Sequence, residues 1–390
     1  MSAPIRAIVL MLATVVAAAP ARAAIPPPAP PESFALIAGA TGADPALLAR
    51  LTAQVASAFD STHGGWVAKR QVPSEAAVSL GFALARHGGP ALWRSRALAT
   101  VDWTWSLYDS VGGGFYERLA NTKSDETSFE KNTASNAARL ENLIEAWQET
   151  GDRVYRAKAA QVLDYMDRVL LDGRGGFIDG QVGSRDLVPR SNGRAIRAWL
   201  VWAAASADPR PRDFALKSLD RAWEEVWHPE LGMQRRSELG NLQKALQLED
   251  QVEMGRAYVL AAHLGGRARD LEHAKSIGDL LEKTFVDPKN GGWRTQAVTQ
   301  KGGKIRNAAS AADENSRAAL FLAELASVSG EARWRDAARR GIDAFSRTFE
   351  KAGLEAAEWA LAVRALGGAD LPARPVWTGE TRRPEVVKKR

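Results

Sequence analysis

The hydrophobic pattern of the chain alternates between two kinds of helical segment. The first kind is amphipathic: in RWRDAARRGIDAFSRTF, Trp334, Ala338, Ile342 and Phe345 share one face, while the arginines lie elsewhere. Such helices pack one side against a core and leave the other side in water. We expect them at roughly 45–59, 91–108, 153–171, 212–227, 270–285 and 331–349.

The second kind of segment is apolar nearly all round, as in AIRAWLVWAAASA and RAALFLAELASV, which predicts helices buried on every side. These segments fall at roughly 74–87, 131–149, 192–206, 249–264, 314–329 and 355–366. Because the two kinds alternate, the pattern predicts twelve helices, with the first kind in an outer ring and the second in an inner ring. The expected fold class is therefore all-α, an (α/α)6 toroid of the six-hairpin glycosidase-like type.

Glycine signals mark the end of each outer helix. The copies are Gly64-Gly65-Trp66, Gly113-Gly114-Phe115, Gly175-Gly176-Phe177, Leu231-Gly232-Met233, Gly291-Gly292-Trp293 and Gly353-Leu354. They recur about every 50 to 60 residues, the period of a unit with two helices and a loop. Paired glycines allow positive φ angles just past a helix, and the aromatic residue is expected to pack back under the loop. Repetition favours a role in the framework over one in catalysis.

The connections also alternate. Segments such as ETGDRV and SVSGEAR predict short turns from inner to outer helices, whereas the first five outer-to-inner connections run roughly 13 to 29 residues. All long loops then lie on one rim, together with the N-termini of the inner helices. We expect a binding cleft on this rim, with the positive ends of the helix dipoles pointing into it.

The two ends of the chain differ from the rest. A basic start, the apolar run 7–19 and Ala21-Arg22-Ala23 predict a signal peptide at 1–23, and hence a secreted or periplasmic protein. A Pro-rich linker at 24–40, the toroid domain at 41–370 and a basic tail at 371–390 follow. No other stretch is apolar enough to cross a membrane, so no stable insertion is expected after signal cleavage.

Composition narrows the chemistry. The chain has no cysteine, which excludes disulfides, thiolate nucleophiles and Cys-ligated metals. Much of the net charge of +6 sits in the tail, and no basic stripe interleaves with aromatic residues, so nucleic acid is not an expected partner. No His, Asp or Glu spacing resembles a zinc site, and no metal or cofactor is expected.

Polar clusters that occur only once are the candidate site. Three of them open inner helices: Phe129-Glu130-Lys131, Glu249-Asp250-Gln251 and Asp313-Glu314-Asn315-Ser316. Helix capping is the alternative role for each cluster. Their convergence at the centre of a toroid favours function, since one shielded carboxylate donates a proton while its partner stays ionised, as in glycosidic cleavage.

We therefore predict Glu130 with Asp250 or Glu249 as the catalytic acid and base. The expected substrate-binding residues are Arg118, Asp125, Glu126, Lys131, Arg190, Asn192, Asp313, Glu314 and Asn315. The aromatic residues Trp66, Phe115 and Trp293 are candidates for stacking on sugar rings, although their place in the repeat favours packing. His63 and His228, in rim loops of opposite units, are an alternative acid/base pair.

Several motifs resemble the toroid domain of the spermatogenesis-associated protein 20 family, to which bacterial YyaL belongs. They are GGGFYER, SFEKNTASNA, RSNGRAIRAWL, LQLEDQVEMGRAYVLA and ADENSRAALFLAEL, in family order from about residue 59 to 330. The residues that match the family pattern are Phe129, Glu130, Lys131, Asn136, Asn192, Gly193, Glu249, Asp250, Asn315 and Ser316. Two features depart from it: a signal peptide replaces the usual thioredoxin-like domain, and FEK continues as NTASNA.

The resemblance implies a six-hairpin toroid, related in shape to N-acylglucosamine 2-epimerases and to several glycosidases, without implying a settled activity. Our leading hypothesis is an exported protein that binds or processes a carbohydrate, with a glycosidase as one enzymatic form. The alternatives are a non-catalytic scaffold or partner-binding module and an epimerase-like sugar isomerase with paired histidines. A small molecule or oligosaccharide is the expected ligand, and the sequence leaves a protein partner and enzymatic activity open.

Overall fold

A computed structural model describes residues 44–68, 72–118, 130–182, 185–237, 240–242, 245–265, 267–298 and 311–373. The expected signal peptide at 1–23 and linker at 24–40 lie outside the described residues. So do most of the expected basic tail at 371–390 and the candidate residues Asp125 and Glu126.

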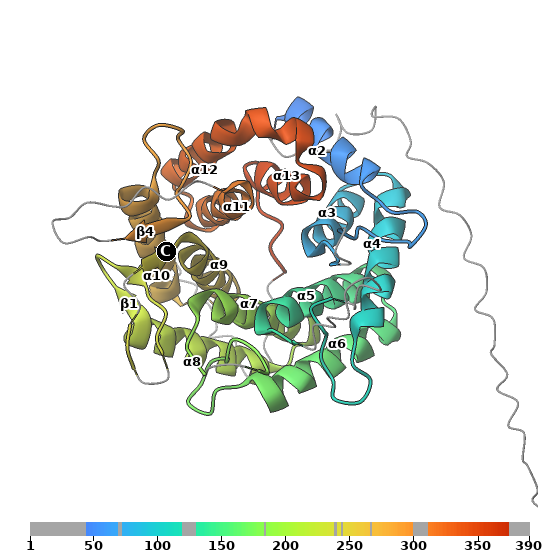
Figure 1. Cartoon of the computed structure of the whole chain (residues 1–390), viewed down its shortest axis with the longest axis horizontal. Helices are drawn as coiled ribbons and strands as arrows, with labels where there is room; N and C mark the ends of the chain where they lie inside the picture. Colours follow the sequence, from blue (N-terminus) through green and yellow to red (C-terminus); the bar gives the residue numbers. More distant parts are fainter. Residues whose placement is uncertain are drawn as a thin grey trace, which may run out of the picture.

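Within this part of the chain, twelve α-helices form two concentric rings (Figure 1). The outer ring consists of α2 (Pro45–Ser57), α4 (Ala91–Thr104), α6 (Arg153–Tyr165), α8 (Pro209–Val226), α10 (Ala268–Leu280) and α12 (Ala332–Phe345). The inner ring consists of α3 (Glu75–Arg86), α5 (Thr133–Thr150), α7 (Pro189–Ser206), α9 (Leu248–Gly265), α11 (Ala312–Ser329) and α13 (Ala356–Ala365). The ring closes where α13 packs against α2 and α3. The predicted (α/α)6 toroid is confirmed.

The short turns from inner to outer helices follow the expected stop signals. After α5, Gly151 adopts a φ of 69°, and the Asp152 side chain accepts a hydrogen bond from the Val154 backbone N–H at 2.8 Å. After α7, Asp208 caps α8 through the backbone N–H of Arg210. A left-handed residue and an acidic cap in succession reverse the chain within two residues.

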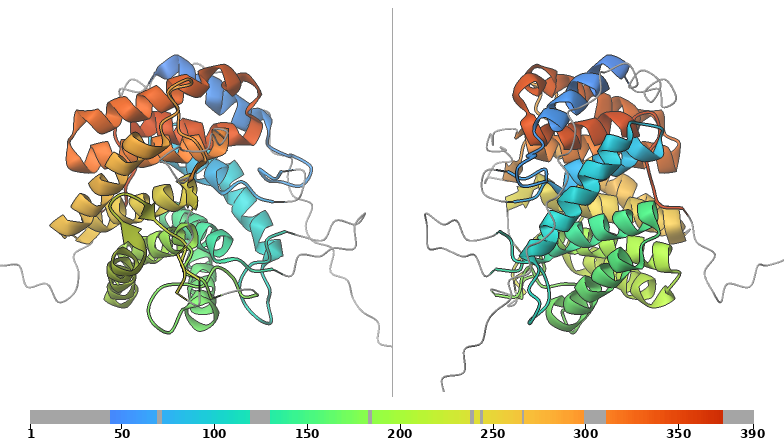
Figure 2. Two further views of the ribbon diagram at one scale, coloured as in Figure 1. Left: turned by 60° about the vertical axis from the view of Figure 1, so that its left-hand side comes forward. Right: turned by 90° about the vertical axis from the view of Figure 1, so that its right-hand side faces the viewer.

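The long outer-to-inner loops carry short elements that the sequence did not predict. Two antiparallel pairs occur in the described loops: β1 (Trp227–His228) with β2 (Gly232–Met233), and β3 (Ala245–Gln247) with β4 (Gln296–Val298). Short helical turns continue four outer helices at η2 (Trp105–Leu107), η3 (Met166–Leu170), η4 (Leu281–Phe285) and η5 (Ser346–Lys351), and η6 (Gly353–Glu355) leads into the inner helix α13. Figure 2 shows these loops on one side of the ring and the C-terminal segment on the other. The rim expected to hold the long loops is therefore present.

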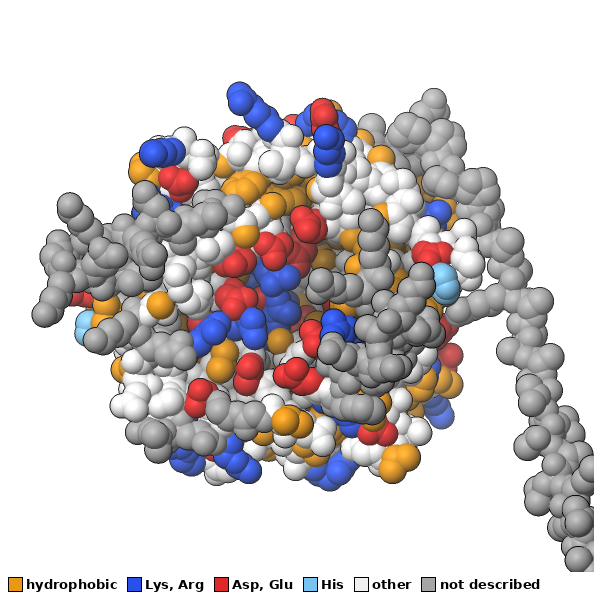
Figure 3. Space-filling view, in the orientation of Figure 1, with side chains coloured by type: hydrophobic (Ala, Val, Ile, Leu, Met, Phe, Trp, Pro, Cys, Tyr) orange, Lys and Arg blue, Asp and Glu red, His pale blue; other side chains and the backbone are white. Residues whose placement is uncertain are grey.

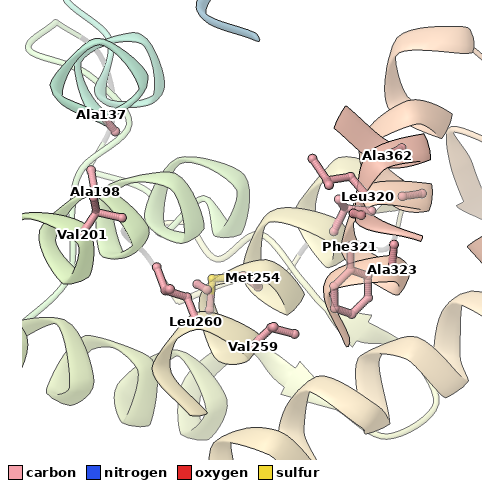
Figure 4. Packing of buried hydrophobic residues seen from close by; sticks show 14 of the residues in the cluster. Ala137, Ala198, Val201, Met254, Val259, Leu260, Leu320, Phe321, Ala323 and Ala362 are labelled. Atoms are coloured by element: carbon pink, nitrogen blue, oxygen red, sulfur yellow. The ribbon is translucent and has the colours of Figure 1, made fainter. Parts of the chain in front are cut away.

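The hydrophobic core involves both rings. Figure 4 shows part of it, with Val201, Leu260 and Phe321 extending from the inner helices α7, α9 and α11. Inner helices approach each other closely: a Cβ atom at Gly193 in α7 would lie 2.5 Å from the carbonyl carbon of Glu253 in α9. Glycine at this position lets the two backbones meet, which fixes the spacing of the inner ring.

In four glycine signals, the residue after the glycine forms backbone hydrogen bonds with an amide side chain from the following inner helix. Asn315 Oδ1 accepts a hydrogen bond from the Trp293 backbone N–H at 2.7 Å, and Asn315 Nδ2 donates to the Trp293 carbonyl at 2.8 Å. The same clamp joins Asn136 to Phe115, Asn192 to Phe177 and Gln251 to Met233. Each amide is the fourth residue of its helix. We call these four residues the amide clamps.

At Gly292, the clamp explains the second glycine of the signal. A Cβ atom at Gly292 would lie 2.7 Å from Asn315 Oδ1, closer than ordinary van der Waals contact allows. The aromatic residues Trp66, Phe115 and Trp293 are at most 1% exposed, so they pack in the core and are not available to stack on a sugar. The glycine signal is part of the framework.

Replacing Asn315 by leucine is expected to lower the free energy of unfolding by about 2 kcal/mol, because the buried Trp293 backbone loses both of its partners. Urea unfolding followed by circular dichroism measures the change. Asn290→Leu, at an exposed amide in the preceding turn, is the matched control. Equal stability of the two variants would show that the clamp contributes nothing.

Candidate functional site

Charged side chains gather in a hollow at the centre of the long-loop face (Figure 3). Two of the predicted clusters contribute to it, since Glu249 and Asp250 open α9, while Asp313 and Glu314 open α11. Their cationic neighbours are Arg190 and Arg235. We call these six residues the rim cluster.

Asp250 accepts hydrogen bonds from two other residues of the rim cluster. Its side chain is 1% exposed, and Oδ2 accepts a hydrogen bond from Arg235 Nε at 2.7 Å. Its Oδ1 accepts from the backbone N–H of Arg190 at 3.0 Å, which ties α9 to the start of α7. Burial raises the pKa of Asp250, although Arg235 and the Arg190 N–H oppose the shift. Because Asp250 is covered and its oxygens are engaged, its role is to position its neighbours rather than to meet a substrate directly.

Glu249 is the more accessible of the two adjacent carboxylates, with 20% of its side chain exposed. Its Oε1 accepts hydrogen bonds from Arg190 Nη1 and from Arg235 Nη2, both at 3.0 Å. Arg190 itself is one-third exposed, so both Glu249 and Arg190 are within reach of a ligand. The predicted placement of Arg190, Glu249 and Asp250 in one cluster agrees with this geometry.

Glu314, at the start of α11, is a partly buried carboxyl group with other carboxylates close by. Burial, and then the neighbouring carboxylates Glu249 and Asp313, raise its pKa to about 7, with only Arg317 opposing them. Its Oε2 atom is buried and has no hydrogen-bond partner among the described residues. A carboxyl group in this state holds or releases a proton near neutral pH, as a general acid or base requires.

Glu130 does not join this cluster in any described contact. Its side chain is exposed, and its backbone carbonyl accepts a hydrogen bond from the Glu117 N–H at 3.0 Å. The N-cap of α5 is Asn132, so Glu130 lies before the helix instead of in its first turn. The described contacts do not bring Glu130 together with Asp250 or Glu249, and the expected partnership of these carboxylates stays a prediction. Arg118 is partly buried and directly precedes the undescribed segment 119–129.

Three of the expected substrate-binding residues serve the framework instead. Asn192 and Asn315 are amide clamps at most 2% exposed, and their amides bind backbone atoms. Lys131 is 3% exposed and donates from Nζ to Asp109 Oδ2 at 2.6 Å and to the Gly113 carbonyl at 2.7 Å. These side chains have no polar group left for a ligand. Asp313, by contrast, is exposed at the start of α11.

A cavity of about 210 Å³ occupies the centre of the inner ring. Its charged lining comes from all six inner helices and the segment that follows α13. The lining cations are Arg86, Arg194, Arg197, Arg256, Arg317 and Arg364, and the lining anions are Glu75, Glu141, Glu145, Glu253, Glu324, Glu358 and Asp370. We call this space the central cavity.

Sequence reasoning missed this charged lining, because it described the inner helices as buried on every side. The signal that reveals it is the spacing of charged residues along otherwise apolar helices, as in Arg190, Arg194 and Arg197 of α7. Residues three and four apart share one helix face, so these arginines form a narrow polar stripe. The inner helices are apolar toward the outer ring and charged toward the cavity.

Ion pairs neutralise most of this lining. Arg194 meets Glu253 at 2.9 Å, and Arg317 meets Glu358 at 2.9 Å. Burial alone would raise the pKa of Glu253, but the surrounding guanidinium groups, led by Arg194 and Arg256, lower it to about 2. The cavity is thus strongly polar, and its walls offer both donors and acceptors.

The segment 366–373, which follows α13, contributes Ala369 and Asp370 to the far end of the central cavity. The Ala369 N–H donates to Ser327 Oγ at the end of α11, and Asp370 accepts from Arg364 and pairs with His87 at 2.7 Å each. The carbonyl of Pro372 lies 2.9 Å from His263 Nε2 in α9. These contacts attach the segment to α9, α11 and α13 and to the residue that follows α3.

Histidine does not line the central cavity. The side chain of His63 is 66% exposed, and its Nδ1 lies 2.6 Å from Asp60 Oδ2 in the same turn. His228 is also exposed, in β1. The histidines visible in Figure 3 lie at opposite edges of the face. This arrangement gives no support to the expected histidine pair.

Neither a metal-binding cluster nor a membrane span occurs among the described residues. Their His, Asp and Glu side chains form no group of three or more that is arranged to hold a metal ion. None of the helices in that same part of the chain combines the length and the apolar character needed to cross a membrane.

Comparisons with solved structures find the same architecture. A D-mannose isomerase superposes with a TM-score of 0.68 at 13% identity, over 82% of this chain and 96% of that chain. A cellobiose 2-epimerase from Bacillus thermoamylovorans gives 0.64 at 13% identity, over 78% and 86%. An inactive variant of an alpha-1,6-mannanase from Salegentibacter sp., in complex with alpha-1,6-mannotetrose, gives 0.50 at 15% identity, over 63% and 67%.

The chain shares the (α/α)6 toroid of these sugar-processing enzymes. At such low identity the likeness shows the fold alone. No protein-family model and no curated protein matches the sequence.

Proposed function

We propose that this protein binds a carbohydrate in the central cavity and processes it by proton transfer at Glu314. The observation that carries the proposal is the state of Glu314: a carboxyl group with a pKa of about 7 and a buried, unpartnered Oε2 atom. It lies one helical turn before Arg317, which lines the cavity. An acid or base poised near neutral pH at the mouth of a polar cavity is what sugar hydrolysis or isomerisation requires.

The cavity suits such a ligand. Its lining offers guanidinium and carboxylate groups from every side, and these groups pair well with the hydroxyls of a sugar. Similarity in fold to an isomerase, an epimerase and a mannanase supports the substrate class. Glu249 and Arg190 are the partners we assign to Glu314, since Glu249 is the charged group that raises its pKa most and is itself partly exposed.

Both enzymatic forms use the same residues. For a glycosidase, Glu314 is the acid and Glu249 the second carboxylate. For an isomerase, the proton transfers of Glu314 replace those expected of His63 and His228. Secretion or a periplasmic location, inferred from the signal peptide, and a relationship to the spermatogenesis-associated protein 20 family remain part of this proposal.

One observation favours the non-catalytic alternative, a scaffold or partner-binding module. The cavity charges largely pair with one another, as in Arg194 with Glu253 and Arg317 with Glu358, which is also what a purely structural interior needs. In that case no sugar would bind, and a protein partner would occupy the long-loop face.

The experiment that tests the proposal is a panel of mono- and oligosaccharides, followed in parallel by thermal shift and by chromatography of products. Ligands that bind the native state raise the melting temperature. We expect at least one sugar to stabilise the protein and to be converted, with a pH profile that bends near 7. Absence of both stabilisation and conversion across the panel would overturn the proposal.

A further inference from the structure

The far end of the central cavity, beside the segment 366–373, holds a buried arginine. Only some of its hydrogen-bond donors have acceptors in the described part of the chain. Arg364 in α13 lines the cavity and has 3% of its side chain exposed. Its Nη2 donates to Asp370 Oδ2 at 2.7 Å. Its Nε and Nη1 atoms are buried and have no acceptor among the described residues.

A second arginine that lines the cavity also has a guanidinium nitrogen without an acceptor in the part that the structure describes. Arg197 in α7 has 13% of its side chain exposed, and its Nη1 atom also lacks a hydrogen-bond partner among the described residues. Arg197 forms two long ion pairs, from Nη2 to Glu141 Oε2 at 3.4 Å and from Nη1 to Glu324 Oε2 at 3.7 Å. Glu324 is already occupied, because it accepts two hydrogen bonds from Arg256 at 2.8 and 2.9 Å.

Unsatisfied guanidinium donors in a buried site are costly, and native proteins retain few of them. A planar oxyanion relieves part of this cost, since it accepts two parallel hydrogen bonds from one edge of a guanidinium group, formed by Nη2 with either Nε or Nη1. The carboxylates Glu141, Glu145, Glu324 and Asp370 line the same cavity. Glu145 accepts hydrogen bonds from Ser79 and Asn142, and Asp370 is paired with both Arg364 and His87, so each is engaged elsewhere.

We propose that the far end of the central cavity binds the oxyanion of an acidic sugar, with Arg364 as the main contact and Arg197 as the second. The group we expect is the carboxylate of a uronic acid, and a sugar phosphate presents the same chemistry. This inference rests on the proposed carbohydrate function and assigns its substrate class. Asp370, as the carboxylate already bound to Arg364, competes with the ligand for the same guanidinium.

The test is calorimetric binding to the full chain of glucuronate and galacturonate, against glucose and galactose as neutral counterparts and glucose 6-phosphate as the phosphate probe. We expect the uronates to bind about tenfold or more tightly than the neutral sugars, since one charge-assisted fork distinguishes them. Tighter binding of glucose 6-phosphate than of the uronates would assign the site to phosphate esters and overturn the uronate assignment.

Two variants test the residues. Arg364→Lys keeps the charge but removes the fork, and is expected to weaken uronate binding about tenfold while neutral sugars are unaffected. Asp370→Asn leaves Arg364 intact and removes the competing charge, so uronate binding is expected to strengthen about fivefold. The second variant keeps the test decisive if the first fails to fold. Arg333→Lys, on the exposed side of α12, is the control.

The outcomes separate this inference from the proposed function. Equal affinity for uronates and neutral sugars, with no gain in Asp370→Asn, would overturn the oxyanion site and leave a carbohydrate function standing. Tight uronate binding without conversion of any sugar would support the site and count against catalysis at Glu314.

Discussion

Replacing Glu324 by glutamine is expected to lower the free energy of unfolding by about 3 to 5 kcal/mol, the usual cost of breaking a buried ion pair from one side. Glu324 is 6% exposed and accepts both hydrogen bonds of Arg256, at 2.9 and 2.8 Å. Burial alone would lower the pKa of Arg256, but Glu324 and Glu253 reverse that effect and raise it, so the guanidinium stays charged. Without Glu324, this charge remains in the cavity wall with its principal partner gone.

Urea unfolding at pH 7 measures this change. Glu272→Gln, at an exposed position on α10, is the matched control and is expected to change stability by less than about 0.5 kcal/mol. The double variant Glu324→Leu with Arg256→Met removes both charges and is expected to return to within about 1 kcal/mol of the wild type. A stable Glu324→Gln single variant would mean that the cavity is well solvated and that its pairs are weak.

The ring architecture was predictable because each local signal agrees with the global fold. Turn signals such as Gly151-Asp152 stand between helices of opposite character, and both residues adopt the expected cap conformations. The polar lining of the cavity was harder to see. Two or three charged residues in a helix such as α11, with Arg317 and Glu324, barely alter its average hydrophobicity, although they define one whole face.

The contacts among the candidate site residues were predictable in part, while their roles stay a prediction. Glu249, Asp250 and Arg190 meet as expected, because the starts of neighbouring inner helices converge. Asn192 and Asn315 were misassigned, since their partners are backbone atoms of another loop and leave no trace in side-chain patterns. Their recurrence at the fourth residue of four inner helices was visible in the sequence, and the same repetition argument that assigned the glycines to the framework would have assigned these amides.

Replacing Glu314 by glutamine is expected to lower kcat about 10²- to 10⁴-fold on whichever sugar the panel identifies, because the variant has no proton to exchange. The same change is expected to stabilise the protein at alkaline pH. The pKa of Glu314 is raised from 4.5 to about 7 in the folded state, so folding favours its protonated form. That contribution is complete below pH 4.5 and is lost as the pH rises through 7.

At pH 8 the wild type bears the full cost of an ionised Glu314, which glutamine avoids. We therefore expect the variant to be more stable than the wild type by about 2 kcal/mol at pH 8, after allowance for solvent screening of a half-buried group, and equally stable at pH 4. Urea unfolding at the two pH values measures the difference, with Glu272→Gln as the control. A Glu314→Gln variant that is less active but more stable than the wild type would identify Glu314 as a catalytic group that is kept at a cost in stability. Unchanged activity with the same gain in stability would mean that Glu314 is buried for structural reasons and that the reacting proton is held elsewhere.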